Sequence, residues 1–253
     1  MTDHSRTPFY VGYLPTPPGL KLFLASIAAG LVGCFAALAL ALGTAQDDTG
    51  DGAFQWGWGP QTVTGVVDLK PYPMLHVTRG SDRIPNGRTL LLSGIGKNGV
   101  QRKFAKFDGQ MVTVKGIALK RGSIDALQVG GGQSDVVGTD DVTVGVPPQS
   151  MGRWRLKGEI CDGKCLAGAM RPGRGLAHRA CANLCLIGGI PPVFVSAAPV
   201  DGTEFFVMGD QNGEPLPQRL LDHVAIYVSI DGEVERRGTI LIFKIDLDTL
   251  KVL

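Results

Sequence analysis

The sequence has no strong excess of charge of either sign. Its 25 Lys and Arg residues nearly balance 23 Asp and Glu residues, which leaves a formal net charge of +2 over 253 residues. Proteins that bind nucleic acid normally carry a basic surface with interleaved aromatic residues, and neither is evident here. We therefore expect no nucleic-acid partner.

Catalytic signatures are also missing. The chain contains no G-x-S-x-G, no P-loop, no H-E-x-x-H and no pair of carboxylates in a plausible pocket. C-x-x-C-H, the attachment motif of covalently bound haem, is absent as well. The sequence therefore indicates a binding or structural role rather than an enzyme, and the leading interpretation needs no cofactor.

Long amphipathic helices are lacking after residue 43. Glycine (36) and proline (16) are abundant instead, which favours short strands joined by tight turns. Four runs have the composition of strands, namely TVTGVVDL from Thr62, TLLLSGI from Thr89, MVTVKGIAL from Met111 and IDALQV from Ile124. The two best helical candidates, 180–186 and 216–223, are short. We expect a mainly β protein.

One long uncharged run is present near the N-terminus. LFLASIAAGLVGCFAALALAL starts at Leu22, and its 21 residues would span about 31 Å as a helix, the thickness of a bilayer core. We assign residues 22–43 to a transmembrane helix. The alternative is a cleaved signal peptide, but the run is longer than a typical h-region and about 20 residues precede it.

The flanks of this helix predict its orientation. Arg6 and Lys21 precede it, whereas the chain after it is acidic and has no Lys or Arg before Lys70. The positive-inside rule then places the N-terminus in the cytoplasm. We expect a single-pass protein of a bacterial inner membrane, with residues 44–253 in the periplasm.

Two segments flank the helix. Residues 1–21 form a cytoplasmic tail rich in proline and aromatic residues, and we expect its prolines to prevent a helix there. Tyr10 and Tyr13 suit the membrane interface or, alternatively, a docking strip for a membrane partner. Residues 44–61 have the composition of a flexible acidic linker.

An internal repeat follows. Residues 112–129 align without a gap with residues 228–245, and each segment contains a strand, a glycine, a second strand, an Arg-Gly turn and a third strand. We infer two copies of one small β domain, at 62–146 and 152–253. A glycine within strands marks the sharp bend that a small barrel needs, so we predict two tandem OB-like barrels. A small sandwich is the alternative.

Four of the five cysteines lie in an insertion, residues 158–190, within the second copy. They form two C-x3-C pairs, Cys161 with Cys165 and Cys181 with Cys185, and His178 precedes the second pair. The first copy has KPYPMLHV in the same place, without cysteine. The cysteines are therefore a separate device on a shared scaffold.

Three interpretations of the cysteines compete. The leading one is two structural disulfides in an oxidising compartment, in any of three connectivities, each loop contributing about 3 kcal/mol. The second is a zinc or copper site made by the four cysteines and His178. Thiol–disulfide exchange is third, because that chemistry usually uses C-x-x-C at a helix N-terminus, and Cys161 ends a predicted strand.

Basic residues give the insertion a local positive charge. Arg171, Arg174 and Arg179 lie between the two cysteine pairs and form a candidate binding face for a partner or an anion. The alternative is an ordinary solvated loop.

The stretch GEICDGKC…HRACANLCLIGGIPPVFV, together with VSIDGEVERRGTILIFKI, resembles a group of uncharacterised exported bacterial β-domain proteins. Their pattern has D-x-x-C, an insertion ending in C-x3-C, and a late V-x-[IV]-x-G strand, and it covers about 100 residues. The N-terminal FYVGYLP strip and the single membrane helix fit the same group. The resemblance implies an accessory protein of a respiratory or molybdenum-enzyme complex, with a protein partner that takes part in electron transfer.

Overall fold

The computed structural model describes residues 18–45, 50–139 and 145–253. The predicted roles of Tyr10 and Tyr13 lie outside the described residues. The chain divides into two compact units, Met1–Asp48 and Thr49–Leu253, and each is described by itself.

The described residues of the first unit form helix α1 (Pro18–Ala45). Its segment Gly19–Gly43 has a mean hydropathy of 2.3 and is long and apolar enough to cross a membrane, a property that a signal sequence shares. The helix begins at Pro18, four residues before the predicted start, and prolines do not exclude a helix at that point. Proline suits the first position of a helix because its missing N–H would have no partner there.

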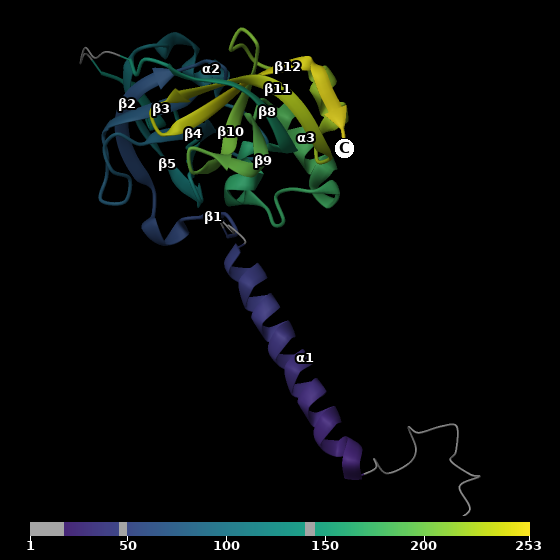
Figure 1. Ribbon diagram of the computed structural model, residues 1–253. Coiled ribbons are helices and arrows are strands. Elements are labelled where there is room, and N and C mark those ends of the chain that lie inside the picture. The colour runs from purple at the N-terminus through teal and green to yellow at the C-terminus, as the bar shows by residue number, and fades with distance from the viewer. Residues whose placement is uncertain (1–17, 46–49, 140–144) are drawn as a thin grey trace, which may run out of the picture. The chain divides into compact units, whose positions relative to one another are not determined.

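The second unit is mainly β, as predicted (Figure 1). Its strands are β1 (Ala53–Phe54), β2 (Gln61–Asp68), β3 (Met74–Arg79), β4 (Thr89–Ser93), β5 (Met111–Arg121), β6 (Ile124–Val129), β7 (Val136–Gly138), β8 (Gln149–Asp162), β9 (Pro192–Val200), β10 (Thr203–Asp210), β11 (Tyr227–Arg237) and β12 (Ile240–Val252). The helices are α2 (Gln101–Phe104) and α3 (Arg179–Ile187), with short helical turns η2 (Trp56–Trp58), η3 (Ala105–Phe107), η4 (Gln133–Asp135), η5 (Cys165–Ala169), η6 (Leu176–His178) and η7 (Gln218–His223).

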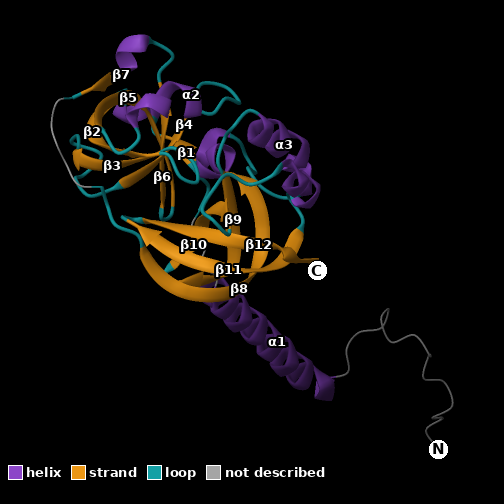
Figure 2. Cartoon of the chain, turned by 90° about the horizontal axis from the view of Figure 1, so that it is seen from above, coloured by secondary structure: helices purple, strands orange, loops and turns teal. Residues whose placement is uncertain are grey.

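Strands β8 to β12 form a closed barrel (Figure 2). Around it the order is β10, β12, β11, β8 and β9, and the pair β10–β12 is parallel while the other pairs are antiparallel. Phe194, Phe206 and Phe243 fill its interior and are fully buried. The closed barrel explains why the strands here alternate between buried and exposed side chains only in part, since both its faces are partly covered.

Strands β2 to β6 repeat the same neighbour relations. β2 pairs with β3 and β5, β3 pairs with β4, β4 runs parallel to β6, and β6 pairs antiparallel with β5. Strands β1 and β7 add to β5. The four strands predicted from composition correspond to β2, β4, β5 and β6, and each begins within one residue of its predicted start.

The repeated segments occupy equivalent positions. Gly116 faces Val129 across β5–β6, and Gly232 faces Ile245 across β11–β12. Each glycine lies inside one continuous strand rather than between two, which corrects the predicted element order. A Cβ at Gly116 would lie 2.4 Å from the carbonyl oxygen of Gln128, so the backbones approach too closely for a side chain.

Part of the predicted linker 44–61 is structured. Ala53 and Phe54 of β1 pair with β5. Trp58 packs against the hydrophobic core of the group formed by strands β2 to β6. Gly52 in this segment is needed for packing, since a Cβ there would overlap the backbone of Ala167.

The two strand groups share a third hydrophobic cluster, which includes Met74, Leu91, Phe205 and Ile242. Around it the Arg-Gly turn of each group reaches the other group. Thr239 exchanges two hydrogen bonds with Thr89, at 3.0 and 3.2 Å, and Ser123, its counterpart in the repeat, is hydrogen-bonded to Thr203. The contact between the groups is therefore approximately symmetric.

Candidate functional site

The insertion connects the first two strands of the barrel. β8 continues to Asp162, so the connection covers residues 163–191 rather than beginning at residue 158 as predicted. In the first strand group, the equivalent connection between β2 and β3 covers only residues 69–73. The additional chain holds η5, η6 and α3.

Local hydrogen bonds set the positions of the cysteines. The Asp162 carboxylate accepts a hydrogen bond from the backbone N–H of Cys165, at 2.8 Å, where the chain leaves β8 and turns. Cys181 and Cys185 are four residues apart in α3, so their side chains lie on one face of the helix.

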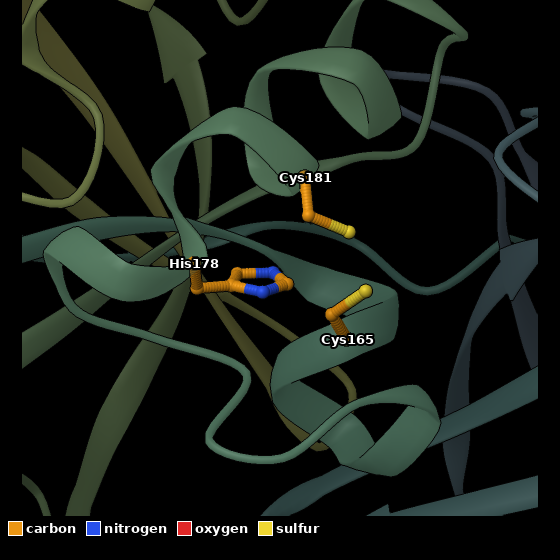
Figure 3. A group of neighbouring side chains, drawn as sticks. All are labelled: Cys165, His178 and Cys181. Carbon is orange, nitrogen blue, oxygen red and sulfur yellow. The ribbon is translucent and has the colours of Figure 1, made fainter.

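Three side chains from different elements meet in this connection (Figure 3). A ring nitrogen of His178 and the sulfurs of Cys165 and Cys181 all lie within 4.8 Å of one another. A second group, Asp162, Cys165 and Cys185, meets the same criterion and shares Cys165 with the first. We call Cys165, His178, Cys181 and Cys185 the Cys3His cluster.

His178 is held by a buried carboxylate. Its Nε2 lies 2.9 Å from Oδ2 of Asp162, and both side chains are almost fully buried. Its Nδ1 is buried and has no hydrogen-bond partner. An unpartnered buried polar atom costs about 1–3 kcal/mol. With the Nε2 proton directed to the Asp162 carboxylate, Nδ1 keeps a free electron pair. Metal-binding histidines characteristically give their other ring nitrogen to a carboxylate in this way.

Cys165 and Cys185 are hydrogen-bonded to each other. Their sulfurs are 3.9 Å apart, and this hydrogen bond raises the pKa of Cys165, which burial raises further. The same hydrogen bond lowers the pKa of Cys185. Within this pair Cys185 is therefore the easier thiol to deprotonate.

No disulfide is present in the described part of the chain, where all five cysteines are free. The 3.9 Å between Cys165 and Cys185 is far beyond the S–S bond length of about 2.05 Å. The structure therefore gives no support to the predicted two-disulfide staple. The distance between the two sulfurs matches instead the sulfur–sulfur separation of about 3.8 Å in a tetrahedral site with metal–sulfur bonds of about 2.3 Å.

Cys161 does not belong to the cluster. Its thiol donates a hydrogen bond to Glu159 at 3.3 Å, and the residue packs in the apolar cluster between the two strand groups. Burial raises its pKa well above the ordinary value, so it stays a neutral thiol. Three of the four cysteines predicted as metal ligands therefore lie in the cluster. Cys161 is excluded because its side chain packs in the apolar cluster between the two strand groups.

Two lysines approach the Cys3His cluster. Lys97 donates hydrogen bonds to the sulfur of Cys181, at 2.6 Å, and to that of Cys185, at 3.8 Å. The contact with Cys181 raises the pKa of Lys97. Lys164 is buried, which lowers its pKa, and its ammonium donates to the carbonyls of Gly94 and Gly96. Two positive charges thus balance part of the negative charge that bound thiolates would carry.

The three arginines predicted to bind a partner have different surroundings. Arg171 is exposed and lies 3.7 Å from Asp51, Arg174 is exposed, and Arg179 donates a hydrogen bond to the carbonyl of Asp222 at 2.7 Å. Arg179 therefore holds α3 against η7, whereas Arg171 and Arg174 are available to solvent.

Sequence reasoning missed two residues of the site. Asp162 binds the backbone of the turn after β8, and the sequence does not predict its contact with His178. Lys97 lies 84 residues before Cys181 in another strand group, and no local signal connects them. The Asp-x-x-Cys spacing was the available signal for Asp162.

Comparison with known proteins finds no matching family model, no matching curated protein and no matching solved structure. The function has to be argued from the geometry of the Cys3His cluster.

Proposed function

We propose that this chain is a membrane-anchored metal-binding protein in which the Cys3His cluster holds one thiophilic ion, Zn²⁺ or Cu⁺. Thiolate and imidazole ligands suit both ions, and four such ligands complete a tetrahedral zinc site. An ion bound by all four would draw the two overlapping groups of ligands together. Each adjacent pair would then be separated by about 3.5–3.8 Å.

The observation that carries the proposal is His178. One of its nitrogens is fixed by Asp162, the other is buried and unpartnered, and a ring nitrogen of this histidine lies within 4.8 Å of two free thiols. A disulfide staple would make no use of an unpartnered histidine nitrogen. A metal ion would use the free electron pair, and the carboxylate would raise the basicity of the ring.

Two features of the setting belong to the same proposal. The flanking charges of α1 favour a cytoplasmic N-terminus and a periplasmic second unit. The strand order supports two OB-like barrels, since in each group the first strand pairs with the second and the fourth, and the third runs parallel to the fifth. A role beside a respiratory or molybdenum-enzyme complex would place the metal site next to electron-transfer partners.

Elemental analysis of the full-length protein, purified in detergent without chelator, tests the proposal. We expect about one Zn or Cu ion per chain in the wild type and in Cys161→Ser, and less than about one-fifth of that in Cys185→Ser. Cys161→Ser is the matched control, because this buried cysteine lies at the end of β8, close to the connection in sequence but outside the cluster.

The same preparations distinguish the disulfide interpretation. Alkylation of the denatured protein without reductant should label Cys161 in the wild type and in Cys185→Ser, and it should label the cluster thiols once the metal has been removed. A wild-type protein with no metal and with four oxidised cysteines would refute the proposal and restore the disulfide staple.

A further inference from the structure

The four members of the Cys3His cluster differ in their access to solvent. Cys165, Cys185 and His178 are buried, with exposed fractions of 5%, 1% and 2%. Cys181 is half-buried, and the exposed residue that covers its sulfur is Lys97. Cys181 is therefore the proposed ligand nearest to solvent, and its sulfur accepts a hydrogen bond from Lys97.

Lys97 is held at this place by the first strand group. It lies in the Lys97 loop, residues 94–100, which connects β4 to α2. Lys164 anchors the start of the loop through the carbonyls of Gly94 and Gly96, at 2.6 and 2.7 Å. At its end, the N–H of Gly99 donates to the carbonyl of Gly188, at 2.8 Å.

Glycines at the end of α3 allow the Lys97 loop to dock. A Cβ at Gly188 would overlap the carbonyl oxygen of Lys97, and the amide of Gln101 donates to the carbonyl of Gly189 at 2.6 Å. The backbone of the Lys97 loop is thus held on both sides of the site, in a position from which the Lys97 ammonium reaches the sulfur of Cys181.

We propose that Cys181 is the exchangeable ligand of the site and that Lys97 promotes metal transfer there to an incoming thiolate. This inference rests on the proposed function. Such a site would deliver its ion to an acceptor instead of retaining it as a purely structural centre.

The exchange step is a ligand substitution. The sulfur of an acceptor thiolate forms a bond to the ion as the bond from Cys181 breaks, and Cys181 leaves as a thiolate. The Lys97 ammonium then pairs with that thiolate through the contact already present. The ion keeps its oxidation state, and no electron or proton is transferred.

The positive charge of Lys97 favours metal transfer in two ways. Its N–H donates to the leaving sulfur and stabilises the thiolate as it forms, which lowers the barrier to departure. The same positive charge attracts an anionic acceptor to the exposed side of the site. Removing the charge while keeping the length of the side chain should therefore slow transfer.

Stopped-flow absorbance with the Zn²⁺-loaded full-length protein in detergent tests this inference. Glutathione is the thiol, and 4-(2-pyridylazo)resorcinol reports the released zinc. We expect a wild-type rate that rises with glutathione concentration, and a rate at least about tenfold lower in Lys97→Met, with Lys97→Arg close to wild type. Lys103→Met is the matched control, since Lys103 binds the carbonyls of Gly130 and Gly132 away from the sulfurs.

Cys181→Ser supplies a second test. It should release zinc faster than the wild type and independently of glutathione, because the exchangeable ligand is already missing. A loaded Lys97→Met protein that transfers zinc at the wild-type rate or faster would overturn the inference while leaving the proposed function intact. A wild-type protein that cannot be loaded with zinc or copper would remove both.

Discussion

The two strand groups of the second unit share their strand order, yet only one carries the Cys3His cluster. Their first strands both contain a glycine that lies against a carbonyl oxygen, and both end in an aspartate beside a histidine, Asp68 with His76 and Asp162 with His178. In the first group the aspartate also binds Arg237, and no cysteine is near in the sequence. The shared strand order does not depend on the cluster, since Cys165, His178, Cys181 and Cys185 all lie in the connection after β8.

The groups also differ in what each gives to the other. The second group supplies the cluster, whereas the first supplies the Lys97 loop that covers it. The two repeat-related arginines both reach across, Arg237 to the carbonyl of Lys70 and Arg121 to that of Leu166. Residues of both groups therefore contact the cluster, although all the proposed ligands belong to one group.

The largest effect is expected where the two groups are most alike. Gly116→Ala and Gly232→Ala should each cost about 3 kcal/mol, because the new Cβ would lie 2.4 and 2.5 Å from a carbonyl oxygen of the neighbouring strand. Differential scanning fluorimetry should show Tm reduced by about 6–12 °C in each variant.

Gly57→Ala is the control for these variants, since nothing lies within 4 Å of a Cβ at that position. Its Tm should remain within about 2 °C of the wild type. A costly Gly232→Ala beside a neutral Gly116→Ala would show that β5 and β11 are not equivalent.

The second prediction separates the two aspartates that end the first strands. Asp162→Asn keeps the size of the side chain but removes the charge that supports His178, so metal affinity should fall about 10- to 100-fold. Competition with a chelator of known affinity measures this change. Asp68→Asn should leave metal affinity unchanged, and an equal loss in both variants would contradict the assignment of Asp162 to the site.

The third prediction compares the two arginines that cross between the groups. Arg237 is mostly buried and donates to Asp68 at 3.0 Å, so Arg237→Ala should cost about 2 kcal/mol. Arg121→Ala should cost less than about 1 kcal/mol, because its contact with Leu166 is long, at 3.5 Å. Thermal unfolding of both variants checks the order, and a larger effect for Arg121→Ala would contradict it.

Much of the fold followed from the sequence, because strand composition and the gapless repeat depend on residues that are close along the chain. β6 has its predicted bounds, Ile124–Val129. The start of α1 did not follow, because proline breaks a helix only when it lies beyond the first turn. The prediction of a linker failed at Ala53, whose pairing with Lys120 is a long-range contact.

The candidate site was predictable only in part. His178 and three of the four cysteines come together as one alternative expected, because a short insertion limits their separation. The exclusion of Cys161 depends on which face of β8 its side chain occupies, and the role of Lys97 depends on the docking of two strand groups. Neither property is encoded in local spacing.

The central claim is that three sulfurs and one imidazole nitrogen surround a single ion. X-ray absorption spectroscopy at the edge of the bound metal tests it most directly, using the full-length protein loaded with one equivalent of Zn²⁺. The account predicts about three sulfur neighbours at about 2.3 Å and one nitrogen at about 2.0 Å, with the nitrogen lost in His178→Ala. A first shell made only of oxygen and nitrogen, or one that is unchanged in His178→Ala, would contradict it.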